Sequence, residues 1–192
     1  NHCKAIGLDW SASVWDIDSL DFLLGYEVPF IKIPSAQLTN HSLLKACRSS
    51  GKKIVLSTGM STLEEIDEAV ALLQGIPLTL LHCNSSYPAK VEDLNLACIG
   101  TLRNRYGCAV GYSGHEYRTG PTVSTVYLGA SVIERHITLD RLSWGTDQMA
   151  SVEPEGLITM VRAIRDLEAA LGDGNKIVTE PEKAIRVKLR GK

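Results

Sequence analysis

The stretch IVLSTGMSTLEEI, residues 54–66, combines a short apolar run with the start of a helix. Residues 54–56 are typical of a buried strand. Thr62 and Glu65 have the spacing of a capping box, in which side chain and backbone cap each other at a helix N-terminus. Ile66, Ala69 and their successors then place apolar groups on one helical face. The stretch therefore predicts a strand, a loop and an amphipathic helix, which together make one β-α unit.

This pattern recurs along the chain. Six short apolar runs begin 24 to 30 residues apart, at residues 5–10, 30–33, 54–56, 78–83, 108–112 and 132–137. Helical patterns fill the gaps, and three of them (residues 43–50, 94–106 and 123–128) end at Gly51, Gly107 and Gly129, where glycine supplies a left-handed C-terminal cap. Strand–helix alternation with short connections predicts a parallel sheet with helices outside it.

The last predicted helix ends the repeating part of the chain. Pro154 suits its first turn, an apolar stripe follows, and Gly172 ends it. Residues 176–192 form a charged stretch typical of a linker. We therefore predict one domain over residues 1–175 and a linker over residues 176–192.

Two architectures fit this alternation, an open doubly wound sheet and a closed (β/α)₈ barrel. The dinucleotide-binding version of the open sheet requires G-x-G-x-x-G after the first strand, and this fingerprint is absent. Nearly every apolar run ends in small polar or metal-binding residues, which in a barrel meet at the carboxyl ends of the strands. We favour an α/β fold of the (β/α)₈ TIM-barrel type, incomplete because six of eight units are visible.

Composition narrows the functional class. The 192 residues are 44% hydrophobic and 22% charged with a net charge of −2, which favours a globular protein and gives no reason to expect nucleic-acid binding. No apolar run is long enough to span a bilayer and no signal-peptide pattern opens the chain, so no membrane partner is expected. The five cysteines are odd in number and lack CxxC spacing, which predicts reduced thiols and a cytoplasmic location.

Two histidines are candidates for a metal site. His115 and His136 each follow a strand-like run in consecutive units, and neutral imidazole is a common ligand of divalent metals. Strand alternation puts His115 with Ser113, and His136 with Glu134, on the inner face. The alternative, two unrelated histidines bonded to backbone, stays open. His82 lies inside an apolar run and is predicted to be structural.

Three further residues have unusual settings. Lys32 places an ammonium in a run that should be buried, so it needs either Glu134 as a partner or an anionic ligand, and both remain open. Asp147 follows the last strand and either orients a substrate hydroxyl or forms an Asx turn. Tyr87 is either a substrate contact or part of a rigid loop.

Taken together, several motifs resemble the sialic acid synthase (N-acetylneuraminate synthase) family. The matching stretches run in family order over nearly the whole chain up to about Gly172: KIPSAQLTN, IVLSTGMSTLEEI, LLHCNSSYPAKVEDLNL, VGYSGHE, GASVIERHITLD and GTDQMASVEPEGL. The resemblance implies a TIM-barrel transferase that condenses phosphoenolpyruvate with N-acetylmannosamine, or a close N-acyl amino sugar, to a nonulosonic acid and phosphate. It also implies a homodimer.

The resemblance assigns roles to residues of this chain. It implies a divalent cation, typically Mn²⁺ with Mg²⁺ or Co²⁺ as alternatives, bound by His115 and His136, which with Lys32 are the expected catalytic residues. The remaining residues are expected to bind substrate, the serines phosphoenolpyruvate and the last two the amino sugar: Ser13, Ser35, Ser57, Ser85, Ser113, Tyr87 and Asp147. Ser13 stands where threonine is more usual, Ser85 where some members have asparagine, and Gly114 where many bacterial members have aspartate.

The resemblance also implies that parts of the enzyme lie outside this sequence. Family members begin with two further β-α units, whose strands carry a glutamate near the sugar, and usually end in an antifreeze-like domain. We therefore expect a fragment whose activity by itself is doubtful. Two alternatives remain: the same chemistry on a diacetamido sugar or on N-acetylmannosamine 6-phosphate, and an inactive truncated barrel that acts as a binding module.

Overall fold

The computed structural model describes residues 2–190, and five parallel strands form its centre. They pair in chain order, each with the next: β1 (Ile31–Ile33), β2 (Ile54–Ser57), β3 (Leu78–Cys83), β4 (Ala109–Gly114) and β5 (Ile133–Arg135). The register pairs Lys32 with Val55, Ser57 with Leu81, and Ser113 with Glu134. This order and direction are those of part of a (β/α)₈ barrel.

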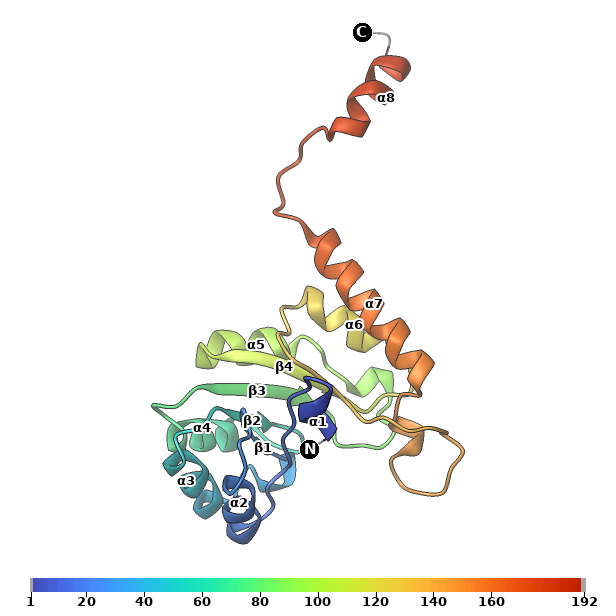
Figure 1. Ribbon diagram of the computed structural model, residues 1–192. Coiled ribbons are helices and arrows are strands. Elements are labelled where there is room, and N and C mark those ends of the chain that lie inside the picture. Colours follow the sequence, from blue (N-terminus) through green and yellow to red (C-terminus); the bar gives the residue numbers. More distant parts are fainter. Residues whose placement is uncertain (1, 191–192) are drawn as a thin grey trace.

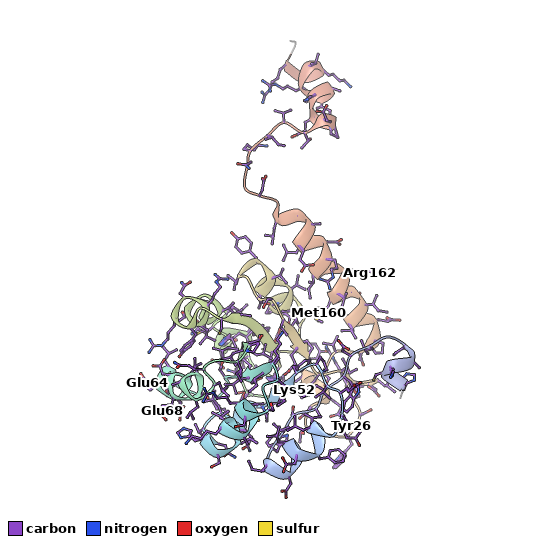
Figure 2. All side chains as sticks on the ribbon, turned by 60° about the vertical axis from the view of Figure 1, so that its left-hand side comes forward. Tyr26, Lys52, Glu64, Glu68, Met160 and Arg162 are labelled. Carbon is purple, nitrogen blue, oxygen red and sulfur yellow. The ribbon has the colours of Figure 1, made fainter. Side chains whose placement is uncertain are left out.

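Helices lie before, between and after the strands and cover the outer side of the sheet (Figure 1). Their bounds are α2 (Ile17–Leu24), α3 (His41–Ser49), α4 (Leu63–Leu72), α5 (Cys98–Tyr106), α6 (Gly120–Tyr127) and α7 (Pro154–Leu171). Short helical turns are α1 (His2–Ala5), η1 (Ser35–Gln37), η2 (Val91–Asp93) and η3 (Gln148–Ala150). On α4, Ile66 and Ala69 are buried, whereas Glu64 and Glu68 lie on the outer side (Figure 2).

The main hydrophobic core lies between the sheet and these helices. Alternate strand residues, such as Ile31, Ile33 and Tyr112, belong to it. The intervening residues, such as Lys32 and Ser113, therefore face the concave inner side, as alternation predicts. The polar side chains of the inner face line a cavity.

The sequence signals of the helix ends are confirmed. Thr62 and Glu65 form the capping box of α4, Pro154 is the first residue of α7, and Gly107 ends α5 with φ 61°. The helix predicted from residue 94 is corrected, because α5 begins only at Cys98. Asn95 has φ 44°, a conformation that asparagine tolerates but that interrupts a right-handed helix.

The first of the six predicted strands is wrong. Residues 5–10 form no strand, and their large side chains are exposed, whereas a strand of a parallel sheet requires paired backbone and two buried faces. The chain meets β1 a few residues later. A single parallel bridge joins Ser13 to Lys32, and Val14 N donates to Lys32 O at 3.0 Å.

The C-terminal part extends away from the sheet. Residues 173–179 connect α7 to α8 (Glu180–Arg190), which has no buried residue and stands apart in Figure 1. The assignment of residues 176–192 as a linker stays a prediction. Within residues 2–190, no helix is both long and apolar enough to cross a membrane.

The two T-x-x-E motifs of the chain allow a matched test of this architecture. Thr62→Ala removes a cap from α4, which packs on the sheet, and should lower the free energy of unfolding by about 1 kcal/mol in urea denaturation. Thr179 and Glu182 make similar contacts at the start of α8. Thr179→Ala should leave the cooperative transition unchanged, because α8 has no buried residue, and equal losses in the two variants would contradict this expectation.

Candidate active site

A cavity of about 420 Å³ lies where the carboxyl ends of the strands meet. All ten predicted site residues line it: Ser13, Lys32, Ser35, Ser57, Ser85, Tyr87, Ser113, His115, His136 and Asp147. They come from strand ends and the loops that follow, because parallel strands direct all their carboxyl ends to one edge. The structure therefore brings together residues from position 13 to position 147 of the chain.

Lys32 is the buried cation of the cavity. It is 8% exposed, its Nζ donates to Ser57 Oγ at 2.7 Å, and it lies 3.4 Å from Glu134 Oε2. Ser113 Oγ donates to the other oxygen of Glu134 at 2.8 Å. Of the two partners expected for Lys32, Glu134 is present. An anionic ligand of Lys32 stays a prediction.

Glu134 is the charged residue among the six lining residues that the sequence did not assign to the site; the others are Trp15, Pro34, Ala36, Met60 and Cys83. It was considered only as a structural partner, although it shares strand parity with His136. That parity was the available signal, because residues two apart on a strand face the same side. Glu134 supplies the carboxylate that contacts Lys32 on the inner face.

Small polar groups crowd one wall of the cavity. Ser35 Oγ accepts a hydrogen bond from Gly59 N at 3.0 Å and lies 3.3 Å from Cys83 Sγ. A Cβ at Gly59 would lie 2.3 Å from Ser85 Oγ, so glycine is needed for this close approach. Burial raises the pKa of the Cys83 thiol, which keeps it protonated.

His115 and His136 lie side by side at the cavity. Their ring centroids are 5.2 Å apart, and the Tyr87 ring lies 4.2 Å from His115 and 5.5 Å from His136. The histidines are therefore neighbours, and Tyr87 contacts both. The two rings therefore share one environment, and a metal role for them stays a prediction.

Hydrogen bonds fix the ring nitrogens. His115 Nδ1 lies 2.6 Å from the carbonyl of Asn84, which can only accept, so Nδ1 carries the proton and Nε2 keeps its lone pair. Burial lowers the pKa of His115 more than the hydrogen bond to Asn84 O raises it, which favours the neutral form. His136 Nδ1 lies 3.5 Å from Asp147 Oδ2, a carboxylate suited to orient the ring.

Asp147 is directed into the site. Besides His136 it accepts a hydrogen bond from Thr146 Oγ1 at 2.7 Å, and its side chain does not cap the η3 turn that follows. The alternative of a simple Asx turn therefore does not describe it. The Asp147 side chain lines the cavity and is about half exposed.

The donor set fits an open metal site better than a closed one. Across residues 2–190, no cluster of three or more His, Cys, Asp and Glu has the arrangement of a metal site. The two histidines supply two nitrogen ligands, each with its other nitrogen held by an oxygen. A divalent cation bound there would keep positions for water or substrate oxygens, as catalytic sites do.

Comparison with known proteins identifies the family. The match to the NeuB family covers residues 1–176. The chain belongs to the NeuB family. The match thus extends over the sheet, the cavity and α7, and ends within the link to α8.

Family members with named activities are similar over nearly the whole chain. An N,N'-diacetyllegionaminic acid synthase from Legionella pneumophila is 36% identical over 97% of this chain and 54% of its own length. An N-acetylneuraminate-9-phosphate synthase from Drosophila melanogaster is 38% identical over 99% and 50%. The chain therefore spans about half the length of these curated relatives.

A solved structure shows the same fold. A crystal structure of an N-acetylneuraminic acid synthetase from Leptospira borgpetersenii serovar Hardjo-bovis, in complex with citrate, has a TM-score of 0.87 and 34% identity. The alignment covers 98% of this chain and 68% of that one. The five strands of this NeuB-family chain are thus the matching part of a larger α/β enzyme fold.

His82 differs from the cavity histidines, and its role can be tested by pH. Its Nε2 lies 2.7 Å from Leu94 O, and burial lowers its pKa below the usual value of about 6.5. Below that pH the unfolded state takes up the proton more readily than the folded state, so this contribution to stability declines as pH falls. His82→Gln should lose less stability than wild type between pH 7 and 5 in urea denaturation. Identical pH dependence of the two proteins would contradict a buried, neutral His82.

Proposed function

We propose that the complete gene product condenses phosphoenolpyruvate with an N-acyl amino sugar to a nonulosonic acid and phosphate. The observation that carries the proposal is the buried Lys32 ammonium, which opens onto the same cavity as the paired histidines His115 and His136. A cation for an anionic substrate thus lies beside nitrogen ligands for a metal that activates an aldehyde. The names of the relatives support this pairing of substrates.

Lys32 and the serines are proposed to bind phosphoenolpyruvate. Its phosphate and carboxylate need positive charge and hydrogen-bond donors, which Lys32 Nζ and the hydroxyls of Ser13, Ser35, Ser57 and Ser113 supply. Ser85 is assigned to the same group. In this scheme Lys32 exchanges part of its contact with Glu134 for a contact with the substrate, at little cost in lost pairing.

The histidine side of the cavity is proposed to receive the sugar. His115 and His136 would bind a divalent cation, Mn²⁺ in the first instance with Mg²⁺ or Co²⁺ as alternatives, which when bound acts as a Lewis acid on the aldehyde. Tyr87 contacts both rings, and Asp147 contacts His136, so both would lie against the acceptor sugar.

The reaction balances as follows. C3 of phosphoenolpyruvate forms a bond to the aldehyde carbon of the open-chain sugar, and the aldehyde oxygen becomes a hydroxyl. Water adds at C2, and the resulting tetrahedral centre expels phosphate and leaves a 2-keto acid. Residues of this chain contribute chiefly by positioning the two substrates and by stabilising the phosphate charge.

The acceptor, assembly and location are finer parts of the proposal. N-Acetylmannosamine is the first candidate, and a diacetamido sugar or N-acetylmannosamine 6-phosphate are the alternatives, since relatives with both kinds of name are similar to this chain. A homodimer and a cytoplasmic location remain proposals; five free cysteines support a reducing compartment. The competing function is an inactive barrel that only binds a ligand.

The test is phosphate release by the complete gene product, supplied with phosphoenolpyruvate, Mn²⁺ and each acceptor in turn. Lys32→Met should lower kcat/KM about 10²-fold or more, because it removes a charge from the reacting anion. Lys45→Met is the matched control, since Lys45 is exposed on α3, and should behave as wild type. No phosphate release with any of the acceptors would overturn the synthase proposal and favour the binding module.

A further inference from the structure

A second buried ion pair lies on the opposite side of the strands that carry the histidines. Glu116 is fully buried and the Arg135 side chain is 2% exposed, with 3.3 Å between Arg135 Nη1 and Glu116 Oε1. Glu116 directly follows His115, and Arg135 directly precedes His136. We call these two residues the outer ion pair, because consecutive residues of an extended chain point to opposite faces.

The outer ion pair is bonded to backbone as well as to side chains. Arg135 Nη2 donates to the carbonyl of Glu116 at 2.6 Å and to the carbonyl of Ala150 at 3.2 Å. Arg135 Nη1 donates to Thr122 Oγ1 at 2.7 Å. One planar guanidinium therefore joins the segment after His115, the strand before His136 and the η3 turn after Asp147.

The carboxylate of Glu116 has its own fixed surroundings. Thr122 Oγ1 donates to Oε1 at 2.6 Å, and Tyr112 OH donates to Oε2 at 3.0 Å. A Cβ at Gly114 would lie 2.8 Å from Glu116 Oε2 and 2.9 Å from Thr122 Oγ1, so the glycine leaves the space that the carboxylate occupies. The geometry of the pair is thus determined by packing on every side.

Stability alone is a poor explanation for this arrangement. The removal of two charges from water costs about as much as their attraction returns, and well-packed apolar residues often serve a fold equally well. Within the described residues, Arg135 Nε has no hydrogen-bond partner, which adds to that cost. The pair does supply geometry. The planar guanidinium of Arg135 is bonded to the carbonyls of Glu116 and Ala150 and so restricts the distance between them.

We propose that Glu116 and Arg135 are positioning residues that set the separation of His115 and His136, and the approach of Asp147, from the outer face of the sheet. The inference rests on the proposed function only for the use of the histidines in metal binding. The β4–β5 register supports it, because Gly114 pairs with Arg135 and one histidine directly follows each of these strand ends. Neither residue contacts the cavity, so their effect passes through the backbone.

The test replaces the pair by neutral residues of similar size in the complete gene product. Glu116→Gln with Arg135→Met removes both charges together, so the fold should survive with an unfolding midpoint near that of wild type. The matched control is Asp67→Asn with Arg105→Met, which removes an exposed pair between α4 and α5 whose Arg105 Nε to Asp67 Oδ1 distance is 2.7 Å. If the double variant does not fold, Arg135→Lys keeps the charge but loses the fork, and decides the question by the same two measurements.

Two measurements separate positioning from structural support. In metal-free crystals, the His115–His136 ring-centroid distance of 5.2 Å should change in the double variant and stay in the control. In Mn²⁺ titrations followed by electron paramagnetic resonance, the variant should bind about 10–100-fold more weakly, the range typical of residues that orient metal ligands. Unchanged ring geometry together with wild-type Mn²⁺ affinity would overturn the proposal.

A failure of the proposed function would look different. If wild type binds no Mn²⁺, or binds it as well after His115→Ala, the metal role of the histidines is wrong. The ring-centroid distance then still decides whether the outer ion pair positions the rings. The two ideas therefore fail on separate observations.

Discussion

Parallel pairing of consecutive strands is the constraint from which the site follows. Each strand of the sheet runs in the same direction beside its sequence neighbour, so the residues after every strand arrive at one edge. Lys32, Ser57, Ser113 and the two histidines are brought together by this rule alone. A single strand in the opposite orientation would send its polar end to the other side of the molecule, and the cavity would lose that wall.

The same strands separate two pairs of opposite charge by face. On the inner face, Lys32 and Glu134 contact each other at 3.4 Å beside a cavity that can admit a ligand. On the outer face, Arg135 and Glu116 are closed off by the helices and by Tyr112. The inner pair can exchange partners when an anion enters, whereas the outer pair cannot move without disturbing the backbone. Thus one face of β5 carries a charged pair beside the cavity, and the other face carries a pair enclosed by the fold.

The grouping of these residues could be predicted because it depends on local patterns. Strand ends, caps and alternation are encoded within a few residues, which is why the capping box of Thr62 was predicted correctly and why the residues expected at the site line one cavity; their roles in binding stay predictions. Residues 5–10 were predicted wrongly because strand formation there depends on neighbours and burial that no local pattern reveals. The outer ion pair was missed for a related reason: Glu116 and Arg135 are 19 residues apart and meet only through the register of β4 and β5.

The proposed function depends most on the binding of the anionic substrate by Lys32. The most direct measurement is a crystal structure of the complete gene product with phosphoenolpyruvate bound. We expect a phosphate or carboxylate oxygen within hydrogen-bond distance, about 2.7–3.2 Å, of Lys32 Nζ, with Ser57 or Ser113 as a further contact. A substrate bound elsewhere, with Lys32 still paired only to Glu134 and Ser57, would contradict it.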